Sequence, residues 1–114
     1  MKLAIVGSRT FHDYEILKRN IISVISINKI SEIISGGAIG ADTLAERFAD
    51  EYHIKKTIIK PEWNKYGRGA GLIRNTEIVK QSDFVFAFYK KSKGTKDTIE
   101  KALKSNTPLF IVLL

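Results

Sequence analysis

Phe84-Val85-Phe86-Ala87-Phe88 is an uninterrupted apolar run and the clearest strand in the sequence. Lys2-Leu3-Ala4-Ile5-Val6 is a second run of this kind, and Gly7 closes it. A strand that faces water on one side alternates apolar and polar residues, whereas a strand covered on both faces is apolar throughout. Because such strands occur almost only in parallel sheets with helices on either side, the two runs predict the centre of an α/β domain.

Apolar runs alternate with amphipathic stretches along the rest of the chain. Further strands are predicted at 32–34, 56–59 and 109–114, and helices at about 14–27, 41–52, 72–81 and 95–105. Residues 60–71, with Pro61 and three glycines, are predicted to form a loop or lid. About five strands and about four helices in alternation imply right-handed βαβ crossovers and a parallel sheet. We therefore expect residues 1–114 to form one three-layer α/β domain.

Composition excludes several classes of site. The chain has 114 residues, which suits one domain, and it has no cysteine, so a disulfide framework and thiolate metal sites are ruled out. Its two histidines, His12 and His53, lie far apart, and no metal site or cofactor is expected. No apolar run is long enough for a membrane span and no cleavable signal is evident, so a cytoplasmic location without membrane contact is expected.

The charge balance favours anionic partners. Nineteen basic and 12 acidic residues give a net charge of +7. Nucleotides, phosphates and nucleic acid all fit this excess, which does not choose among them. The simpler interpretation is solubilising charge on helix surfaces.

Ligands of open parallel sheets bind beyond the carboxyl ends of the strands, near the point where the strand order reverses. The four loops at those ends are rich in glycines, hydroxyls and cations: Gly7-Ser8-Arg9-Thr10, Ser35-Gly36-Gly37-Ala38-Ile39-Gly40-Ala41-Asp42, residues 60–71 and residues 90–95. Small residues let an anion approach the backbone, and the following helix supplies N–H donors and a positive dipole. These loops are the candidate binding site.

The segment from Ser35 to Asp42 carries the strongest signal. Its small residues at a strand-to-helix turn leave backbone amides uncovered for a phosphate, while Asp42 either caps the helix or contacts a ligand hydroxyl. A tight turn with close helix packing is the structural alternative. A dinucleotide fingerprint would need glycine at Ser35, and no G-x-x-x-x-G-K-[ST] phosphate loop is present, so an ordinary NAD dehydrogenase or P-loop NTPase is disfavoured.

Individual side chains extend this candidate site. Arg9 is suited to bidentate phosphate binding, and Arg74-Asn75 and Lys93-Gly94-Thr95, with Thr98 one turn on, are further anion-binding candidates. Trp63 and Tyr66 are placed to stack on a base. Each has a structural alternative: a surface arginine, a solvated first turn, helix capping by Thr95, or aromatics that fold the loop onto the sheet.

The loops resemble the YspA/YpsA-related branch of the SLOG superfamily across nearly the whole chain. The motifs that carry the resemblance are Gly7-Ser8-Arg9, Ser35 to Asp42, Trp63-x-x-Tyr66-Gly67, Ile73-Arg74-Asn75 and Ser92-Lys93-Gly94-Thr95, in the family's order and spacing. The resemblance implies a Rossmann-like fold and binding or processing of nucleotides and of NAD- or ADP-ribose-derived molecules. Some members act as sensors in conflict and defence systems. LOG phosphoribohydrolases and the DNA-uptake protein DprA belong to the same superfamily.

The likeness to LOG enzymes is incomplete at the residues that chemistry needs. Arg74 matches their catalytic arginine and Gly94-Thr95 matches part of their second glycine motif, but Thr98 stands where that motif ends in glutamate. Asp97 and Glu100 are near that position and out of register. N-glycosidic cleavage needs a carboxylate to stabilise charge or activate water. Many family members also carry a basic residue where Ile39 stands, so one phosphate contact is missing here.

The sequence therefore predicts a protein that senses or sequesters a small phosphorylated nucleotide-type ligand. The alternatives are a LOG-like nucleoside-monophosphate hydrolase, with Arg74 and Asp97 or Glu100 as its catalytic groups, and a single-stranded DNA-binding protein. A homodimer or tetramer is expected. The predicted ligand-binding residues are Gly7, Ser8, Arg9, Thr10, Ser35, Gly36, Gly37, Ala38, Gly40, Ala41, Asp42, Trp63, Tyr66, Arg74, Asn75, Lys93, Gly94, Thr95 and Thr98.

Overall fold

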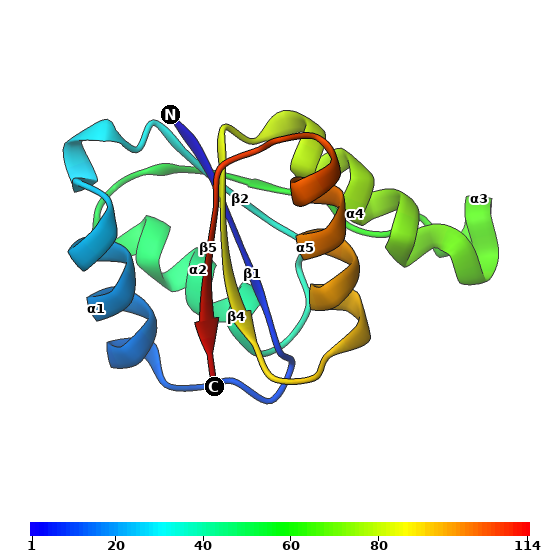
Figure 1. Cartoon of the computed structure of the whole chain (residues 1–114), viewed down its shortest axis with the longest axis horizontal. Helices are drawn as coiled ribbons and strands as arrows, with labels where there is room; N and C mark the ends of the chain where they lie inside the picture. Colours follow the sequence, from blue (N-terminus) through cyan, green and yellow to red (C-terminus); the bar gives the residue numbers. More distant parts are fainter.

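The two uninterrupted apolar runs form the centre of the sheet. In the computed structural model, which describes residues 1–114, β1 (Lys2–Gly7) pairs in parallel with β4 (Phe84–Tyr89). Leu3 lies opposite Phe84 and Gly7 opposite Phe88. Apart from the exposed Lys2 at the start of β1, both strands are apolar because helices cover both of their faces (Figure 1).

Three further strands complete an all-parallel sheet of five. They are β2 (Glu32–Ser35), β3 (Lys55–Ile58) and β5 (Leu109–Leu113), and the order across the sheet is β3-β2-β1-β4-β5. The chain builds outward from β1 to β3, then crosses back to β4 on the other side of β1. The predicted α/β fold is confirmed, and its reversal of strand order lies between β1 and β4.

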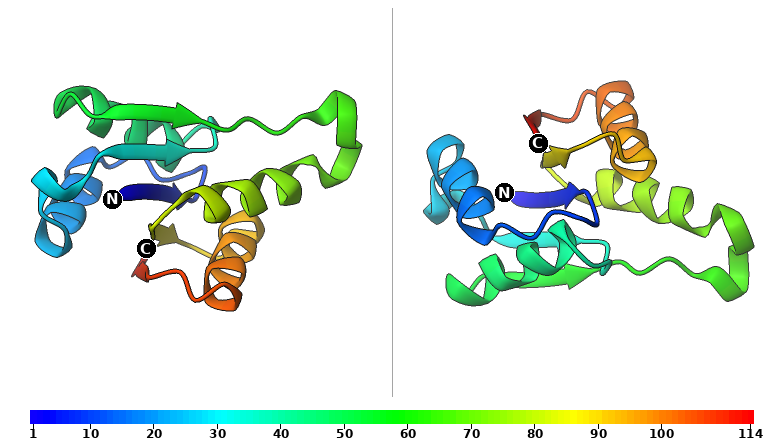
Figure 2. Two further views of the ribbon diagram at one scale, coloured as in Figure 1. Left: turned by 90° about the horizontal axis from the view of Figure 1, so that it is seen from above. Right: turned by 90° about the horizontal axis from the view of Figure 1, so that it is seen from below.

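Helices form a layer on each face of the sheet, as Figures 1 and 2 show. The elements between the strands are α1 (Tyr14–Val24), a 3-10 turn (Ile27–Lys29), α2 (Ala41–Glu51), α4 (Ala70–Gln81) and α5 (Lys93–Lys104). Side chains of β1 alternate between two cores: Leu3 and Ile5 pack with α1 and α2, whereas Ala4 and Val6 pack with α4 and α5. This alternation is the period-two pleat of a strand that is buried on both sides.

The segment between β3 and α4 is a helical arm and not the predicted loop. It contains the short helix α3 (Trp63–Tyr66) and a 3-10 turn (Gly67–Gly69), and it projects beyond the carboxyl ends of the strands before α4 returns to the sheet (Figure 2). The Glu62 carbonyl accepts bonds from the amides of Lys65 and Tyr66, which closes the α3 turn. Gly67 ends α3 with a positive φ of 59°, a backbone conformation that favours glycine. The glycine at this position therefore marks the end of a helix and not a loop.

Other element boundaries differ from the prediction by up to three residues. α5 begins at Lys93, two residues earlier than expected, because Ser92 caps it by accepting a hydrogen bond from the Thr95 amide. α1 ends at Val24, since Ile25 is already extended. None of the helices has the length and apolar character that crossing a membrane requires.

Candidate functional site

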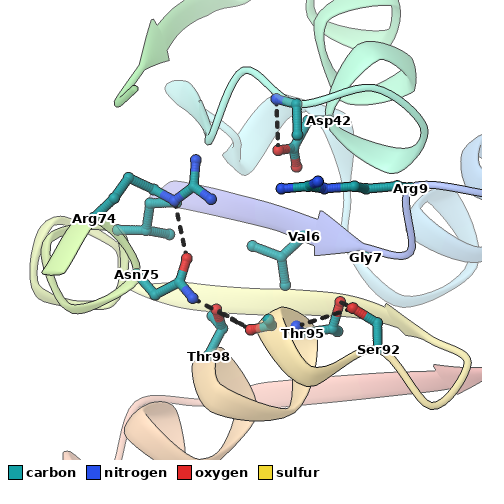
Figure 3. Close-up of a pocket in the computed structure, with 12 residues that line it drawn as sticks. Val6, Gly7, Arg9, Asp42, Arg74, Asn75, Ser92, Thr95 and Thr98 are labelled. Carbon is teal, nitrogen blue, oxygen red and sulfur yellow. Dashed lines mark hydrogen bonds between the residues drawn. The ribbon is translucent and has the colours of Figure 1, made fainter. Parts of the chain in front are cut away.

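A cavity of about 240 Å³ opens at the carboxyl ends of β1 and β4, where the strand order reverses. This is the position at which open parallel sheets bind ligands. Figure 3 shows Arg9 and Arg74 reaching into the cavity from opposite sides, with Asp42 on one flank and Ser92, Thr95 and Thr98 on the other. The lining residues are Val6, Gly7, Arg9, Ala38, Asp42, Arg74, Asn75, Ile78, Ser92, Gly94, Thr95 and Thr98.

Two glycines let the loops meet at this point. A Cβ on Gly7 would lie 2.7 Å from the Phe88 carbonyl oxygen and 2.8 Å from Ala41 Cβ, which is closer than packing allows. Gly40 has φ 81°, and a Cβ there would lie 2.5 Å from the carbonyl oxygens of Ser8 and Arg9. Their small size lets the start of α2 dock on the loop after β1, where the Ala41 amide donates to the Ser8 carbonyl over 3.1 Å.

Arg74 is held in position by two hydrogen bonds. Its Nη1 donates to the Gly36 carbonyl over 2.6 Å, and its Nε donates to Asn75 Oδ1 over 2.9 Å. Gly36 must remain a glycine for this, because a Cβ would lie 2.4 Å from Arg74 Nη1. Burial of the guanidinium lowers the pKa of Arg74, and the charge of Arg9 lowers it further, while Asp42 acts in the opposite direction.

Asp42 is the only carboxylate that lines the cavity, and only 7% of its surface is exposed. Its Oδ2 accepts a hydrogen bond from the Ala38 amide over 3.1 Å. Burial raises the pKa of Asp42, although this bond and the nearby Arg74 charge favour the ionised form. The Ala38 amide is thus already paired inside the protein, which leaves a phosphate fewer backbone donors in this loop than the sequence suggested.

Asn75 links α4 to the first turn of α5. Its Nδ2 donates to the Gly94 carbonyl over 3.3 Å and to Asp97 Oδ2 over 3.2 Å. The buried Thr98 hydroxyl donates to the same Gly94 carbonyl over 3.2 Å. The first N–H groups of a helix have no intrahelical acceptor, but the Thr95 amide is already bonded to the Ser92 hydroxyl, so the Lys93 and Gly94 amides are the backbone donors left at this turn.

A second hollow, of about 500 Å³, adjoins the cavity. The two share Arg9, Ala38 and Arg74. The rest of its wall comes from the Ser35–Asp42 loop and the base of the arm: Gly36, Gly37, Ile39, Lys60, Pro61 and Trp63. The two arginines therefore stand at the junction of one continuous cleft, with Trp63 in its outer part.

Some predicted site residues lie beneath or beside the cleft. Ser8, Thr10, Ser35, Gly40 and Ala41 line neither hollow. The Ser8 and Thr10 hydroxyls bond each other over 2.8 Å, and the buried Ser35 hydroxyl bonds the Asp42 carbonyl over 3.4 Å. These residues shape the loops from within.

The remaining predicted residues lie toward the outside. Tyr66 lines a third hollow of about 190 Å³ beside the arm, which shares Lys60 and Arg74 with the second hollow, and Lys93 is exposed. Asp97 is paired with Lys101 over 2.7 Å, and Glu100 lies on the outer surface of α5 with Lys96, 4.0 Å away. Neither of these two carboxylates lines the cavity.

Several residues of the cleft wall are not among the predicted ligand-binding residues. Val6 and Ile78 are apolar residues inside a strand and a helix, where nothing distinguishes a wall residue from a core residue. Lys60 and Pro61 follow β3 directly, so their place at a strand end was a usable signal. No three His, Asp or Glu side chains gather in a way that would hold a metal ion.

The fold and cleft define a class: a Rossmann-like α/β domain with a cationic, glycine-built cleft at its strand-order reversal. Residues 1–66 match the family described as YspA, cpYpsA-related SLOG. The chain belongs to this family, as its loop motifs indicated. The match covers β1 to β3 and the arm helix α3, whereas Arg74 and the start of α5 lie beyond it.

Known proteins similar to this chain include one phage protein and two solved structures. The Gene 61 protein of Mycobacterium phage D29 is 31% identical over 85 residues, covering 68% of each chain. DNA processing protein A (DprA) from Streptococcus pneumoniae has a TM-score of 0.70 and 25% identity over 96% of this chain. DprA from Helicobacter pylori, described as having a unique single-stranded DNA binding mode, has a TM-score of 0.73 and 23% identity over 97%. The present chain spans 49% and 64% of these two DprA chains.

Proposed function

We propose that this protein binds a small phosphorylated nucleotide-type ligand in the cleft and acts as a sensor or a sequestering protein. The observation that carries the proposal is the pair Arg9 and Arg74, which face each other across a cavity with one buried carboxylate. Two guanidinium groups against one carboxylate leave an excess positive charge. A phosphate between them would neutralise this charge and accept bidentate hydrogen bonds.

The first turn of α5 supports a phosphate position on the other side of the cavity. The hydroxyls of Ser92 and Thr95 lie beside the helix N-terminus, whose dipole and whose Lys93 and Gly94 N–H groups favour an anion. A phosphate here would lie between α5 and the two arginines. In this arrangement the phosphate depends less on the backbone amides of the Ser35–Asp42 loop than the sequence suggested, because the Ala38 amide already donates its hydrogen bond to the Asp42 carboxylate.

The remaining polar and aromatic groups suit the rest of a nucleotide. Asp42, a carboxylate on the cavity wall, is a hydrogen-bond acceptor that fits a sugar hydroxyl. Trp63 lines the outer hollow and is 54% exposed, so a base can stack on its indole face. With the arginines at the junction, phosphate, sugar and base each have a chemically matched surface.

The carboxylate arrangement favours binding over turnover. A LOG-like hydrolase needs an acidic group beside the bond that breaks. Here Asp97 is engaged by Lys101 and Asn75, Glu100 lies outside, and the cavity wall at that turn is Thr98. Incubation with a nucleoside monophosphate should release no free base, which chromatography would detect.

The intrinsic fluorescence of Trp63 tests the proposal, because it is the only tryptophan in the chain. Titration with AMP, NAD or ADP-ribose should change the emission in a saturable way for at least one of them. Saturable change that disappears in Arg74→Ala and persists in Arg68→Ala, a variant on the exposed arm, would support the site. A flat response to all three ligands would contradict it.

Single-stranded DNA is the second candidate, favoured by the likeness to the Helicobacter pylori protein with its single-stranded DNA binding mode. Exposed cations at the carboxyl edge of the sheet add to the cleft arginines: Lys60, Lys90, Lys91 and Lys93. A strand that neutralised Z phosphates would lose affinity with salt at a log–log slope of about −0.7Z. Fluorescence anisotropy of a labelled oligonucleotide across a salt series would measure this slope, and a negligible affinity at low salt would remove the candidate.

A further inference from the structure

The side-chain amide of Asn75 has one orientation that its surroundings accept. Only 6% of this residue is exposed. Its Oδ1 accepts from Arg74 Nε, as Figure 3 shows, and its Nδ2 donates to the Gly94 carbonyl and to Asp97 Oδ2. A reversed amide would set two N–H donors against each other on the Arg74 side and three oxygens together on the other side. The acceptors beside Nδ2 therefore keep Oδ1 turned toward Arg74.

Asp97 is the stronger of these two acceptors. Its Oδ2 lies 3.2 Å from Asn75 Nδ2, and a hydrogen bond to an ionised carboxylate is stronger than one to a neutral carbonyl. The Gly94 carbonyl lies 3.3 Å away and also accepts from the Thr98 hydroxyl. Asp97 is thus the main acceptor that holds the Asn75 amide.

Lys101 fixes Asp97 in turn. Its Nζ donates to Asp97 Oδ2 over 2.7 Å and to the Leu72 carbonyl of α4 over 2.7 Å. The side chains of Asp97 and Lys101 are 24% and 27% exposed, so both are shielded from most of the solvent. The carboxylate is therefore held between α5, which carries it, and α4, which carries its partner Asn75.

At the other end of this chain of bonds, Arg74 keeps only part of its guanidinium for a ligand. A guanidinium has five N–H donors. The Nε donor is used by Asn75 and one Nη1 donor by the Gly36 carbonyl, so the donors that remain are all on the two terminal nitrogens. Arg74 therefore offers the end of its guanidinium to the cavity, and it cannot turn without losing one of these two bonds.

We propose that Asp97 is a positioning residue for Arg74, which it orients through the Asn75 amide although it does not line the cavity. The inference rests on the proposed binding of an anion by Arg74. It gives Asp97 a role opposite to that of its charge. A carboxylate near an anion site repels the ligand, so its removal alone would strengthen binding. Through the Asn75 amide, its removal weakens binding.

Two substitutions separate geometry from charge. Asp97→Ala and Asp97→Asn both remove the negative charge, but asparagine keeps an oxygen, which faces the two neighbouring donors, Asn75 Nδ2 and Lys101 Nζ. In calorimetry with AMP, NAD and ADP-ribose, Asp97→Ala should bind about fivefold more weakly than the natural chain, a typical loss for one hydrogen bond. Asp97→Asn should recover most of that loss.

Glu100→Ala is the matched control for these variants. It removes a carboxylate from the same helix, at a position where the side chain is 61% exposed and faces only Lys96. It should therefore bind each ligand as the natural chain does. Circular dichroism checks that every variant is folded.

Hydrogen exchange tests the same role without a ligand. An N–H group that is bonded inside a protein exchanges its hydrogen with water slowly. NMR of isotope-labelled protein follows the Nε–H group of Arg74, identified by its absence in Arg74→Lys. In the natural chain and in Asp97→Asn we expect exchange about tenfold slower than at the exposed Arg68, and in Asp97→Ala most of this difference should disappear.

Two results would overturn the proposal. One is equal exchange of the Arg74 hydrogen in the natural chain and in Asp97→Ala. The other is tighter binding in both Asp97 variants, which charge alone predicts. If the natural chain binds none of the three ligands, the proposed function is contradicted instead, and the exchange measurement still decides whether Asp97 positions Arg74.

Discussion

Asp42 is a buried acid, and its ionisation couples the cleft to pH. Because burial raises its pKa above the ordinary value of 3.8, the folded chain holds this proton more tightly than the unfolded chain does. The group's contribution to stability therefore falls as pH rises from 3.8 through the raised pKa, and is constant above it. The side chain in Asp42→Asn cannot ionise, so its contribution to stability does not fall as pH rises.

The stability of Asp42→Asn relative to the natural chain should consequently increase with pH across that interval. Urea unfolding of both proteins, from below pH 3.8 to neutral pH, measures the difference, and the other carboxyl groups cancel in it. Parallel stability curves would mean that Asp42 titrates alike in the folded and unfolded states.

Ile39 marks a place where an added charge should strengthen binding. Its side chain is 67% exposed and lines the outer hollow with Arg9 and Lys60. Ile39→Arg adds a cation at that wall, and we expect about a fivefold gain in affinity for a phosphorylated ligand, a typical worth for a partly exposed ion pair. Asn28→Arg makes the same charge change on the exposed 3-10 turn before β2, and should leave calorimetric affinity unchanged. Equal gains in both variants would indicate only a general charge effect.

At the scale of elements, α5 depends on its Ser92 cap. The Ser92 hydroxyl accepts from the Thr95 amide and lies 3.1 Å from the Thr95 hydroxyl. Ser92→Ala should lower the free energy of unfolding by about 1 kcal/mol, the usual worth of an N-cap, as measured by denaturant titration. Ser23→Ala, on the exposed surface of α1, should change it by less than about 0.5 kcal/mol. A loss no larger in Ser92→Ala than in this control would mean that the cap contributes little.

Helical phase explains why the carboxylates of α5 could be located only in part from the sequence. Successive helical residues turn by about 100°, so Gly94, Thr95 and Thr98 share the face toward the cavity. Asp97 lies off that face and Glu100 lies farther round, and the sequence spacing already implied this. Their ion pairs with lysines could not be predicted, because they depend on side-chain conformations.

The arm shows the opposite case. Pro61 and three glycines between 60 and 71 are typical of a loop, and no apolar periodicity indicates a helix in so short a segment. The structure uses Gly67 as a helix end and buries Ala70 at the start of α4. Tertiary contacts therefore decided the local conformation.

At the scale of the whole molecule, the sequence predicted the fold well because parallel strands have a direct signature. Leu3 to Val6 and Phe84 to Phe88 face two separate cores, so every position must be apolar. The edge strand β3 carries lysines, so its apolar pattern is weaker, and the predicted strand at 56–59 begins one residue later than the observed Lys55–Ile58. The place of the cleft was also predictable, since it follows from strand order and glycine loops, whereas its wall depends on which side chains turn inward.

We propose above that the two arginines at the strand-order reversal, Arg9 and Arg74, hold a nucleotide-type anion. Isothermal titration calorimetry of the natural chain, Arg74→Ala and Arg68→Ala with AMP, NAD and ADP-ribose tests it most directly. We predict that at least one ligand binds the natural chain and Arg68→Ala alike, and binds Arg74→Ala about 1.5–3 kcal/mol more weakly, the worth of a charged hydrogen bond. Equal affinity in all three proteins, or no binding by any of the ligands, would contradict it.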